Sequence, residues 1–364
     1  MKNAITPEEQ IELANIRRER KQRELHYRHA AEFEIKGYCN DFNQIHNLDR
    51  IDYGICVAAG MTAGAFDALY IGIPQSSKEG VRGGWLDEMV RRWFDKKFPK
   101  EEMEKLSRCK TAKVPYDAQD NRNLYDEPNE PVDGLSAYYH RLLSLGHDPF
   151  LGFFVGIYDI MRGTMTTISK AGVLQSQEMP MYVKQMTTDI LEAIKKQWLH
   201  MKTDVNTSMG LPVPLMALFN TLQFGEIGKE KLTVAEIVQG MYYQGYDFQH
   251  FCAMSIPTML LEIIVRAAWW IRMKKAVPVF SSRQRTPKLD TMLCFSHTIF
   301  CGINVTKVVI TENPCAINYP EWCRFTKLLV REARWQLVDK STARLSYVTE
   351  KLSAHPRKYK DLVL

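Results

Sequence analysis

Apolar residues recur at intervals of three and four along almost the whole chain, a spacing that places them on one face of an α-helix. The stretch Thr6-Pro7-Glu8-Glu9 combines a threonine cap, a proline at the first helical position and a capping-box glutamate. It predicts a long charged helix that continues to about Lys36. Further helices are expected over residues 49–72, 85–98, 100–108, 135–144, 149–170, 180–203, 233–245, 247–274, 287–311, 320–339 and 341–353. No convincing set of strands is found, so the pattern predicts an all-α multi-helix bundle with an N-terminal charged helical extension.

The helical pattern is interrupted most clearly over residues 109–133, which hold three prolines and many Asp and Asn residues. Loops of this length are uncommon unless they are functional or flexible. We therefore expect a charged extension over 1–46, a first helical segment over 47–108, a long loop over 109–133 and a main helical domain over 134–364.

Three stretches are long and apolar enough to raise the question of membrane insertion: residues 53–75, 250–273 and 291–306. A membrane span needs about 20 mostly apolar residues. Asp67 interrupts the first stretch, Glu262 and Arg266 interrupt the second, and the third is short. Two interpretations follow: helices buried inside a soluble protein, or membrane helices whose charges face a bundle interior.

Two regions carry features of a membrane surface contact. The charged helix, residues 8–36, contains the dense basic run RRERKQR, which suits either a solvated helix face or anionic lipid. Trp269 and Trp270 adjoin cationic residues at the end of an apolar helix, as interfacial anchors do, although a core helix whose end reaches solvent has the same pattern.

Composition limits the class of protein. Hydrophobic residues make up 45% of the 364 residues and charged residues 25%, which is ordinary for a folded chain. The net charge of +6 is too small to indicate nucleic acid, which we consider an unlikely partner. The N-terminus lacks the apolar segment of a signal peptide, and the eight irregularly spaced cysteines suggest reduced thiols. A cytoplasmic or inner-membrane-associated protein is expected.

A short pattern, Gly-x-x-x-Gly-x-x-Asp, occurs twice. It comprises Gly60, Gly64 and Asp67 in GMTAGAFDALYIGIP, and a second copy, residues 152–159, ends at Asp159. On a helix these positions share one face, and small residues four apart let two backbones approach closely. The simplest prediction is that the two helices pack against each other.

The two aspartates admit a structural and a functional interpretation. Each caps a neighbouring helix or pairs with a buried Arg, or else the two form a paired-carboxylate site. A hard divalent ion would suit such a site, with further ligands from His147 and Asp148, and from His200 and Asp204, which stand four residues apart. The weak metal candidates are therefore Asp67, Asp159, His200 and Asp204, and no cofactor can be named.

Other polar residues lie inside apolar helices and need partners. Glu262 and Arg266 are four residues apart, and Asn304 and Lys307 follow His297. We expect Asn304 and Lys307, with Asn313 and Asn318, to satisfy Asp67, Asp159 or Glu262 across a bundle with a polar interior. Cys294, His297 and Cys301 share a helix face, which suits zinc, but without paired CxxC knuckles a set of core residues is favoured.

Several segments resemble a bacterial family found near prophage and mobile-element genes. They are GAFDALYIGIP, GHDPFLGFFVGIYDI, HMKTDVNTSMGLPVP, LLEIIVRAAWWIR and the pair GINVTKVVI and ENPCAIN, spread over residues 54–320. The resemblance implies a glycine-containing helical protein and a setting in bacterial defence or mobile-element biology. It implies no activity and no catalytic residue.

Three functions are compatible with these patterns. The first is a non-enzymatic helical assembly or effector protein that associates with membranes or forms an oligomeric polar path, for which a homo-oligomer is expected. The second is a cytoplasmic metal-dependent enzyme that uses the Asp and His residues at the centre of the bundle. The third is a scaffold that recruits a partner through its long N-terminal helix.

Overall fold

The computed structural model describes residues 7–77, 80–117, 140–179, 186–207, 210–276 and 287–354. The chain forms two compact units. Unit 1 comprises Met1–Val57, Val265–Ser296 and Thr326–Leu364, and unit 2 comprises Ala58–Ile264 and His297–Phe325. The fold is all-α and multi-helical, as the hydrophobic pattern predicts.

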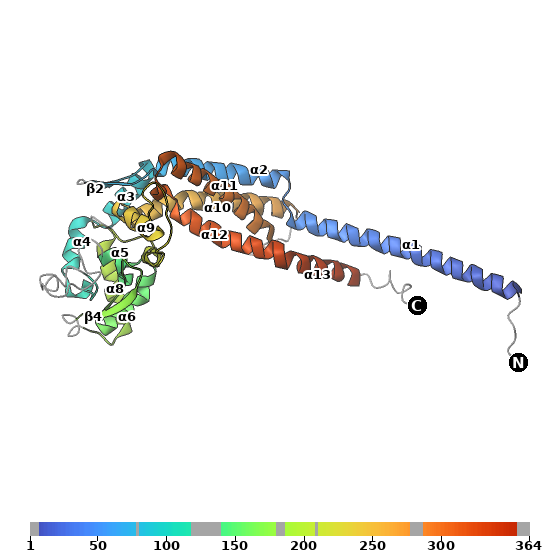
Figure 1. Ribbon diagram of the computed structural model, residues 1–364, viewed down its shortest axis with the longest axis horizontal. Helices are drawn as coiled ribbons and strands as arrows, with labels where there is room; N and C mark the ends of the chain where they lie inside the picture. Colours follow the sequence, from blue (N-terminus) through green and yellow to red (C-terminus); the bar gives the residue numbers. More distant parts are fainter. Residues whose placement is uncertain are drawn as a thin grey trace. The chain divides into compact units, whose positions relative to one another are not determined.

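Helices account for most of the described residues (Figure 1). The α-helices are α1 (Pro7–His46), α2 (Arg50–Phe66), α3 (Trp85–Lys97), α4 (Lys100–Ser107), α5 (His140–Leu143), α6 (Val155–Arg162), α8 (Ile190–Asp204), α9 (Val234–Tyr243), α10 (Phe248–Ala276), α11 (Pro287–Thr311), α12 (Tyr319–Arg334) and α13 (Lys340–Ser353). Two π-helical turns, η1 (Asp67–Ile71) and η8 (Trp335–Asp339), extend α2 and α12. The short 3-10 turns are η2 (Lys110–Ala112), η4 (Leu145–His147), η5 (Leu151–Phe153), η6 (Met216–Thr221) and η7 (Pro314–Ala316).

Several predicted helix boundaries are confirmed. The helix α1 begins at Pro7, although its predicted cap, Thr6, lies outside the described residues, and it ends at His46 rather than near Lys36 as predicted. The hydroxyl of Thr233 accepts the backbone N–H of Glu236, whose carboxylate accepts the N–H of Thr233, so the capping box before α9 is complete. The bounds of α10 and α11 follow their apolar patterns closely.

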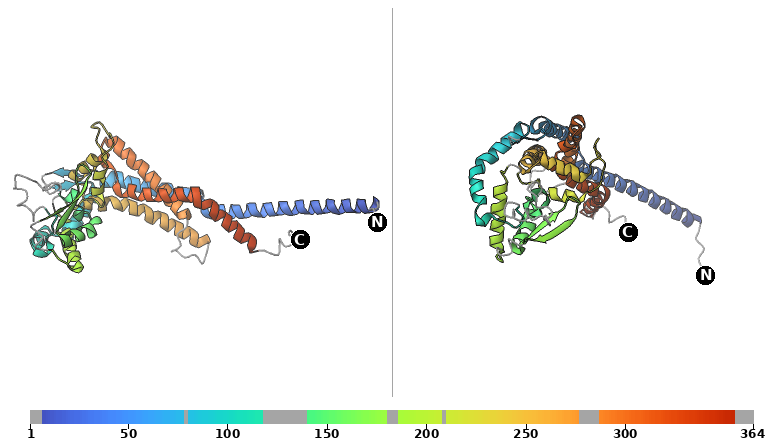
Figure 2. Two further views of the ribbon diagram at one scale, coloured as in Figure 1. Left: turned by 60° about the horizontal axis from the view of Figure 1, so that its bottom comes forward. Right: turned by 60° about the vertical axis from the view of Figure 1, so that its left-hand side comes forward.

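The prediction of a single helix over residues 149–170 is wrong. The helix α6 ends at Arg162, and Gly163, which follows it, adopts a left-handed conformation with φ of 68°. The chain then forms strand β3 (Thr164–Ile168), which pairs antiparallel with β4 (Leu174–Glu178) beside α6 (Figure 2). A β-branched, alternately buried run, Thr-Met-Thr-Thr-Ile, favours a strand once glycine has ended the helix.

Three other expectations need adjustment. A second antiparallel hairpin, β1 (Gln75–Ser77) with β2 (Gly80–Arg82), precedes α3. The helix expected over 180–203 begins only at Ile190, where the Asp189 side chain caps it, and residues 180–185 lie outside the described residues. The helix expected over 135–144 is described only as the short α5, and most of the loop 109–133 also falls outside the description.

Unit 1 is held together by ring contacts and by a buried carboxylate. Asp52 on α2 is almost fully buried and receives Arg272 from α10 at 3.0 Å and Lys288 from α11 at 2.7 Å. The rings of Tyr53 and Phe295 meet edge to face at 5.3 Å. Because two cations share one buried carboxylate, this contact fixes α2, α10 and α11 against each other in unit 1.

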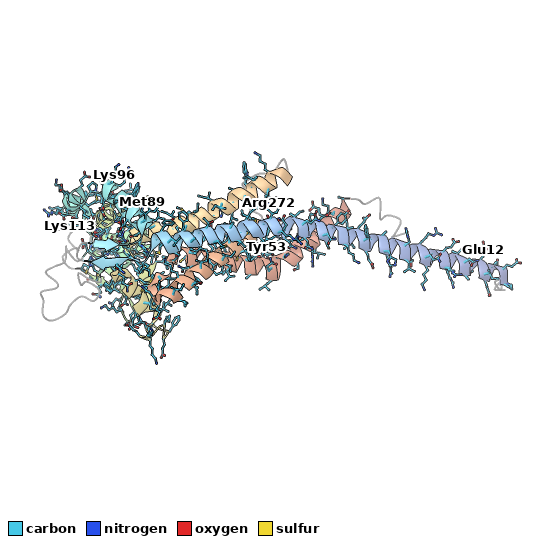
Figure 3. All side chains as sticks on the ribbon, turned by 90° about the horizontal axis from the view of Figure 1, so that it is seen from above. Glu12, Tyr53, Met89, Lys96, Lys113 and Arg272 are labelled. Atoms are coloured by element: carbon cyan, nitrogen blue, oxygen red, sulfur yellow. The ribbon has the colours of Figure 1, made fainter. Side chains whose placement is uncertain are left out.

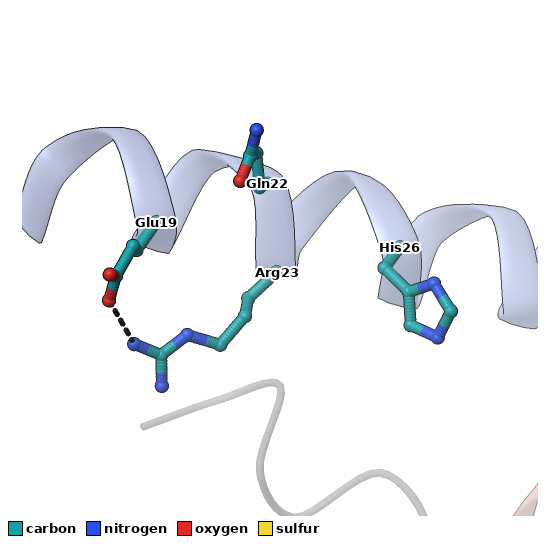
Figure 4. Close-up of a pocket in the computed structure, with 4 residues that line it drawn as sticks. All are labelled: Glu19, Gln22, Arg23 and His26. Carbon is teal, nitrogen blue, oxygen red and sulfur yellow. Dashed lines mark hydrogen bonds and ion pairs between the residues drawn. The ribbon is translucent and has the colours of Figure 1, made fainter. Parts of the chain in front are cut away.

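Much of α1 is exposed to solvent, and its side chains project on all sides (Figure 3). Glu19 and Arg23 pair at 3.5 Å beside Gln22 and His26 (Figure 4). This pair is exposed and joins one turn to the next on the same helix, so it contributes little to stability. We assign no binding site to the surface of α1.

Unit 2 has an apolar core, to which α3, α5, α9, the first part of α10 and the loop that precedes η6 contribute. Ile71, Leu86, Leu142, Tyr246 and Met254 are among its fully buried members. A separate cluster packs α6 and β3 against α8. These two cores position the polar side chains described next.

Three helical segments within the described residues are long and apolar enough to cross a membrane: Pro7–Ile71, Phe248–Lys274 and Pro287–Thr311. At most 39% of each apolar window is buried inside the protein. Large apolar side chains such as Met61, Ile263 and Val309 are exposed along them. Helices of this length and composition allow an association with a membrane.

Candidate metal centre

Three buried ligand-bearing side chains converge in unit 2. His200 and Asp204 lie one turn apart on the last turns of α8, and His147 ends the 3-10 turn η4. Their residues are no more than 5% exposed. The sequence predicted that His200 and Asp204 share a face, and the structure brings His147 to that face.

The ligand atoms of these three residues form a compact triangle. The Nε2 atoms of His147 and His200 are 3.2 Å apart, and Asp204 Oδ2 lies 3.5 Å from each of them. In a tetrahedral zinc site with bonds of about 2.0–2.2 Å, two ligand atoms are separated by about 3.3–3.6 Å. The triangle thus has the dimensions of one face of a zinc coordination tetrahedron.

The hydrogen-bond balance of this cluster also favours a bound cation. Two neutral histidines can share a single N–H between their facing nitrogens. Asp204 Oδ2 and His147 Nδ1 are nevertheless buried without a hydrogen-bond partner. Buried polar atoms of this kind are uncommon in folded proteins and require an explanation. A divalent cation in the triangle would satisfy Asp204 Oδ2 directly.

Burial keeps His147 in the form that binds metal. Burial lowers the pKa of His147 well below its ordinary value, and the neighbouring His200, His140 and Arg141 lower it further. A neutral imidazole is the form that coordinates a metal. For Arg141, burial alone would lower the pKa, but the adjacent Asp204 raises it, so the guanidinium stays charged.

Arg141 orients the carboxylate of the cluster. Its Nη2 donates to Asp204 Oδ1 at 3.2 Å, and its Nη1 donates to the hydroxyl of Thr207. This contact directs the second oxygen, Oδ2, toward the two histidines. Groups that orient a ligand from behind are a regular feature of metal sites.

Glycines allow the chain to close around the cluster. The Nε2 of Gln197, one turn before His200, donates to the carbonyl of Gly146 at 2.8 Å. A Cβ at Gly156 would lie 2.5 Å from Gln197 Oε1, and a Cβ at Gly146 would lie 2.6 Å from the Tyr116 ring. That ring meets His147 edge to face at 5.0 Å. The second glycine motif therefore does permit a close approach, but between α6 and α8.

Asp148 fixes the turn that carries His147. Its Oδ1 accepts the backbone N–H groups of Phe150 and Leu151, and its Oδ2 accepts that of Leu215 at 2.5 Å. Burial raises the pKa of Asp148, although these three N–H groups act in the opposite direction. Asp148 thus serves the local backbone rather than the triangle.

A second potential ligand group adjoins the first. Asp117, His140 and His147 offer ligand atoms that all lie within 4.8 Å of one another. Asp117 also lines a cleft of about 470 Å³ that reaches Asp204 and Arg141. Lys100 and Arg108 contribute further cationic groups to this cleft. The candidate centre therefore lies beside a cleft lined by both acidic and basic side chains.

Asp67 does not join this centre, so the metal set that included it is wrong. Its Oδ1 accepts Asn318 Nδ2 at 2.7 Å, and its Oδ2 accepts Asn304 Nδ2 and Lys307 Nζ, each at 3.1 Å. Both oxygens are therefore saturated by α11 and the residues that precede α12. The expectation that Asn304 and Lys307 satisfy Asp67 is confirmed.

Asp159 is also separate from the metal triangle and from Asp67. It accepts the hydroxyls of Thr164 and Thr166 and the N–H of Thr166 from β3. The predicted packing of the two Gly-x-x-x-Gly faces is wrong, because each faces another partner. Gly64 opposes Ile303 of α11, where an added Cβ would lie 2.5 Å from the side chain, whereas Gly156 opposes Gln197.

The remaining polar candidates form a second network in unit 2. Glu262 receives the guanidinium of Arg324, a contact the sequence did not suggest. His297 Nδ1 lies 2.7 Å from Glu321 Oε1, and Thr258 donates to Glu321 Oε2 at 3.0 Å. His297 thus has a carboxylate partner, and Cys294 and Cys301 are buried as expected of core thiols.

Sequence reasoning missed several residues around the centre: Tyr116, Asp117, His140, Arg141 and Gln197. One usable signal was the spacing of His140 and His147, seven residues apart in a segment rich in His and Asp. The other residues are too common in type to be selected without knowledge of the fold.

Comparisons with protein-family models, with curated proteins and with solved structures found no match to this chain. The functional argument therefore rests on the geometry above.

Proposed function

We propose that this protein is a membrane-anchored, metal-dependent hydrolase of anionic esters. The observation that carries the proposal is the triangle of His147, His200 and Asp204, with its edges of 3.2–3.5 Å and its unpartnered Asp204 Oδ2. Two imidazoles and one carboxylate form a donor set found in catalytic zinc sites. A bound divalent ion would supply Lewis acidity at the edge of the cleft.

The cleft supports a negatively charged substrate. Lys100, Arg108 and Arg141 line it beside an equal number of carboxylates, and guanidinium and ammonium groups are the usual partners of phosphate and carboxylate. Asp117 and His140, whose Oδ1 and Nε2 are 3.7 Å apart, stand beside the same cleft. We assign to this pair the transfer of the proton that hydrolysis requires.

The apolar helices support the membrane part of the proposal. Three segments have the length and composition of membrane spans, and no more than 39% of each apolar window is buried inside the protein. The predicted anchor at Trp269 and Trp270 fits in part: Trp270 is half-exposed with the Lys274 ammonium 4.7 Å from its ring centroid, whereas Trp269 is buried. Attachment to the cytoplasmic face of an inner membrane is the corresponding location.

The assembly hypothesis and the scaffold hypothesis remain predictions. The saturated contacts of Asp67 favour a structural role for that carboxylate, because every oxygen has donors from the same chain. A homo-oligomer and a partner for α1 are likewise still predictions, as is the setting in bacterial defence or mobile elements.

Hydrolysis of chromogenic phosphate esters tests the proposed reaction. The full chain, purified in detergent and supplied with Zn²⁺ or Mn²⁺, is expected to hydrolyse p-nitrophenyl phosphate or bis(p-nitrophenyl) phosphate. The variants His200→Ala and Asp204→Asn should lose at least about a hundredfold in rate, since each removes a metal ligand. The matched control Asp159→Asn changes a buried carboxylate outside the centre and should keep the wild-type rate.

Rates that are the same in all three variants, or activity that is unaffected by chelators, would contradict the proposal. Circular dichroism of each variant separates loss of catalysis from loss of the fold.

A further inference from the structure

The helix α3 has an exposed apolar stripe, as α8 does in the same unit. Trp85, Met89 and Trp93 are spaced four residues apart and are 56%, 41% and 53% exposed. Residues at this spacing lie on one face of a helix. Exposed tryptophans in adjacent turns are unusual on a surface that meets only water.

The opposite face of α3 is firmly docked, so the stripe cannot be explained by a loosely attached helix. Leu86 and Phe94 are buried, and Asp87 bonds Nδ1 of His250 at 2.8 Å. Arg91 makes a two-pronged contact with Asp247, at 2.8 Å and 3.0 Å. These contacts fix which face of α3 is turned outward.

Basic side chains border the stripe. Arg92, Lys96 and Lys97 are exposed, and Lys96 lies on the same face as Met89 (both can be located in Figure 3). The acidic residues Glu88 and Asp95 lie to one side of the stripe, and Asp95 is bonded by Asn206. Apolar rings flanked by cations are the pattern of helices that lie in the headgroup region of an anionic bilayer.

The start of α3 is attached to the end of a candidate membrane span. The segment Pro7–Ile71 ends where Tyr70 contacts Trp85, with their ring centroids 6.0 Å apart. The N–H of Gly84 donates to the carbonyl of Ile71 at 2.7 Å. A Cβ at Gly84 would lie 2.4 Å from the carbonyl oxygen of Tyr70, so only glycine permits this approach.

Tyrosine and tryptophan concentrate where a membrane span meets the headgroups. We infer that the Trp85–Met89–Trp93 face of α3 lies in the interface of an anionic lipid membrane and sets the depth of unit 2 against it. This inference rests on the membrane anchoring proposed above. Tyr70 and Trp85 form the corner at which the span ends and the interfacial helix begins.

Fluorescence quenching by brominated lipid tests this inference. The full chain is reconstituted into vesicles of phosphatidylcholine and phosphatidylglycerol whose acyl chains carry bromine near the headgroup. The difference in emission between the wild type and a Trp85→Phe/Trp93→Phe variant isolates the two tryptophans of α3. We expect this difference signal to be quenched by the brominated lipid and protected from aqueous iodide.

A Trp270→Phe variant supplies the matched control within a candidate span. If the Trp270 signal is quenched by brominated lipid and the α3 signal is quenched only by iodide, the inference about α3 is overturned while the anchoring stands. If neither signal responds to brominated lipid, both fail. An α3 signal that is protected from both quenchers would show a protein surface there, such as a second copy of this chain, and would also overturn the inference.

The charge of the lipid is tested with Arg92→Ala/Lys96→Ala/Lys97→Ala. Quenching of the α3 signal should weaken in this variant, and for the wild type it should weaken when phosphatidylglycerol is omitted. Quenching that depends on neither change would contradict the anionic part of the inference. Phenylalanine replacements preserve an exposed apolar ring, so the test does not depend on a disruptive change.

Discussion

At the scale of single residues, the protein uses buried carboxylates in two distinct ways. Asp67 and Asp159 have donors for both oxygens, whereas Asp204 has one oxygen held by Arg141 and the other without a donor. A saturated carboxylate stabilises its surroundings, and an unsaturated one is free to accept a ligand. This difference separates the structural aspartates from the candidate metal ligand.

Asp159 gives a prediction about pH. Burial raises its pKa from 3.8 to about 6, although the hydrogen bonds from Thr164 and Thr166 oppose this shift. Because the folded pKa lies above the unfolded one, the folded state binds the proton more tightly. The free energy of unfolding should therefore decrease as the pH rises from about 4 to about 6, by on the order of 2 kcal/mol from this residue.

The variant Asp159→Asn removes this contribution and keeps the size of the side chain. Thermal unfolding of the wild type and the variant, measured side by side between pH 4 and pH 7, should show the variant gaining relative stability through that window. Other titrating groups are common to both proteins and cancel in the comparison. A difference that stays constant with pH would contradict the assigned role of Asp159.

At the scale of secondary-structure elements, close approach at glycine positions the candidate centre. Gly156 on α6 faces Gln197 on α8, one turn before His200. Replacement of Gly156 by Ala should push α6 away from α8 and cost about 1–3 kcal/mol in the free energy of unfolding. Metal affinity should fall with it, because His200 follows Gln197 on the same helix.

The matched control for that change is Gly240→Ala on α9, where an added Cβ meets nothing within 4 Å. There alanine should leave stability unchanged or raise it by up to about 1 kcal/mol, since it favours the helix. Chemical denaturation in detergent, with metal titration of each variant, measures both effects. Equal destabilisation by the two substitutions would show that the α6–α8 contact is less constrained than the structure indicates.

Helix patterns could be predicted well from the sequence, and tertiary partners only in part. Apolar spacing locates α10 and α11, and the capping box locates α9. The repeated Gly-x-x-x-Gly-x-x-Asp pattern correctly indicates close packing at each site, but it does not specify the opposing surface. Ile303 and Gln197 are ordinary residues without any marker in the sequence, so the pairing of the two motifs with each other was an error.

The residues of the candidate site could likewise be predicted from the sequence only in part. His200 and Asp204 could be paired from their spacing on one helix, and His147 was already among the candidates. Arg141 and Asp117 could not be selected, because their roles depend on how α5 and the residues after η2 approach α8. The hairpin β3–β4 was missed because a helical pattern of apolar residues continues past Gly163.

At the scale of the whole molecule, we propose that the chain combines a membrane anchor with a metal centre. The proposed anchor rests on three segments that are long and apolar enough to cross a membrane, and the proposed centre on a buried His–His–Asp triangle beside a cleft lined by acidic and basic side chains. Each feature has an ordinary alternative when it is considered alone. A stoichiometric metal ion bound at this triangle in a membrane protein would favour the proposed function over such ordinary roles.

The most direct test is the metal content of the full chain recovered from alkali-washed membranes and loaded with Zn²⁺. The account predicts about one ion per chain for the wild type and for Asp159→Asn, and only background metal for His200→Ala. Release of the protein by the alkaline wash, absence of metal in the wild type, or an unchanged metal content in His200→Ala would contradict it.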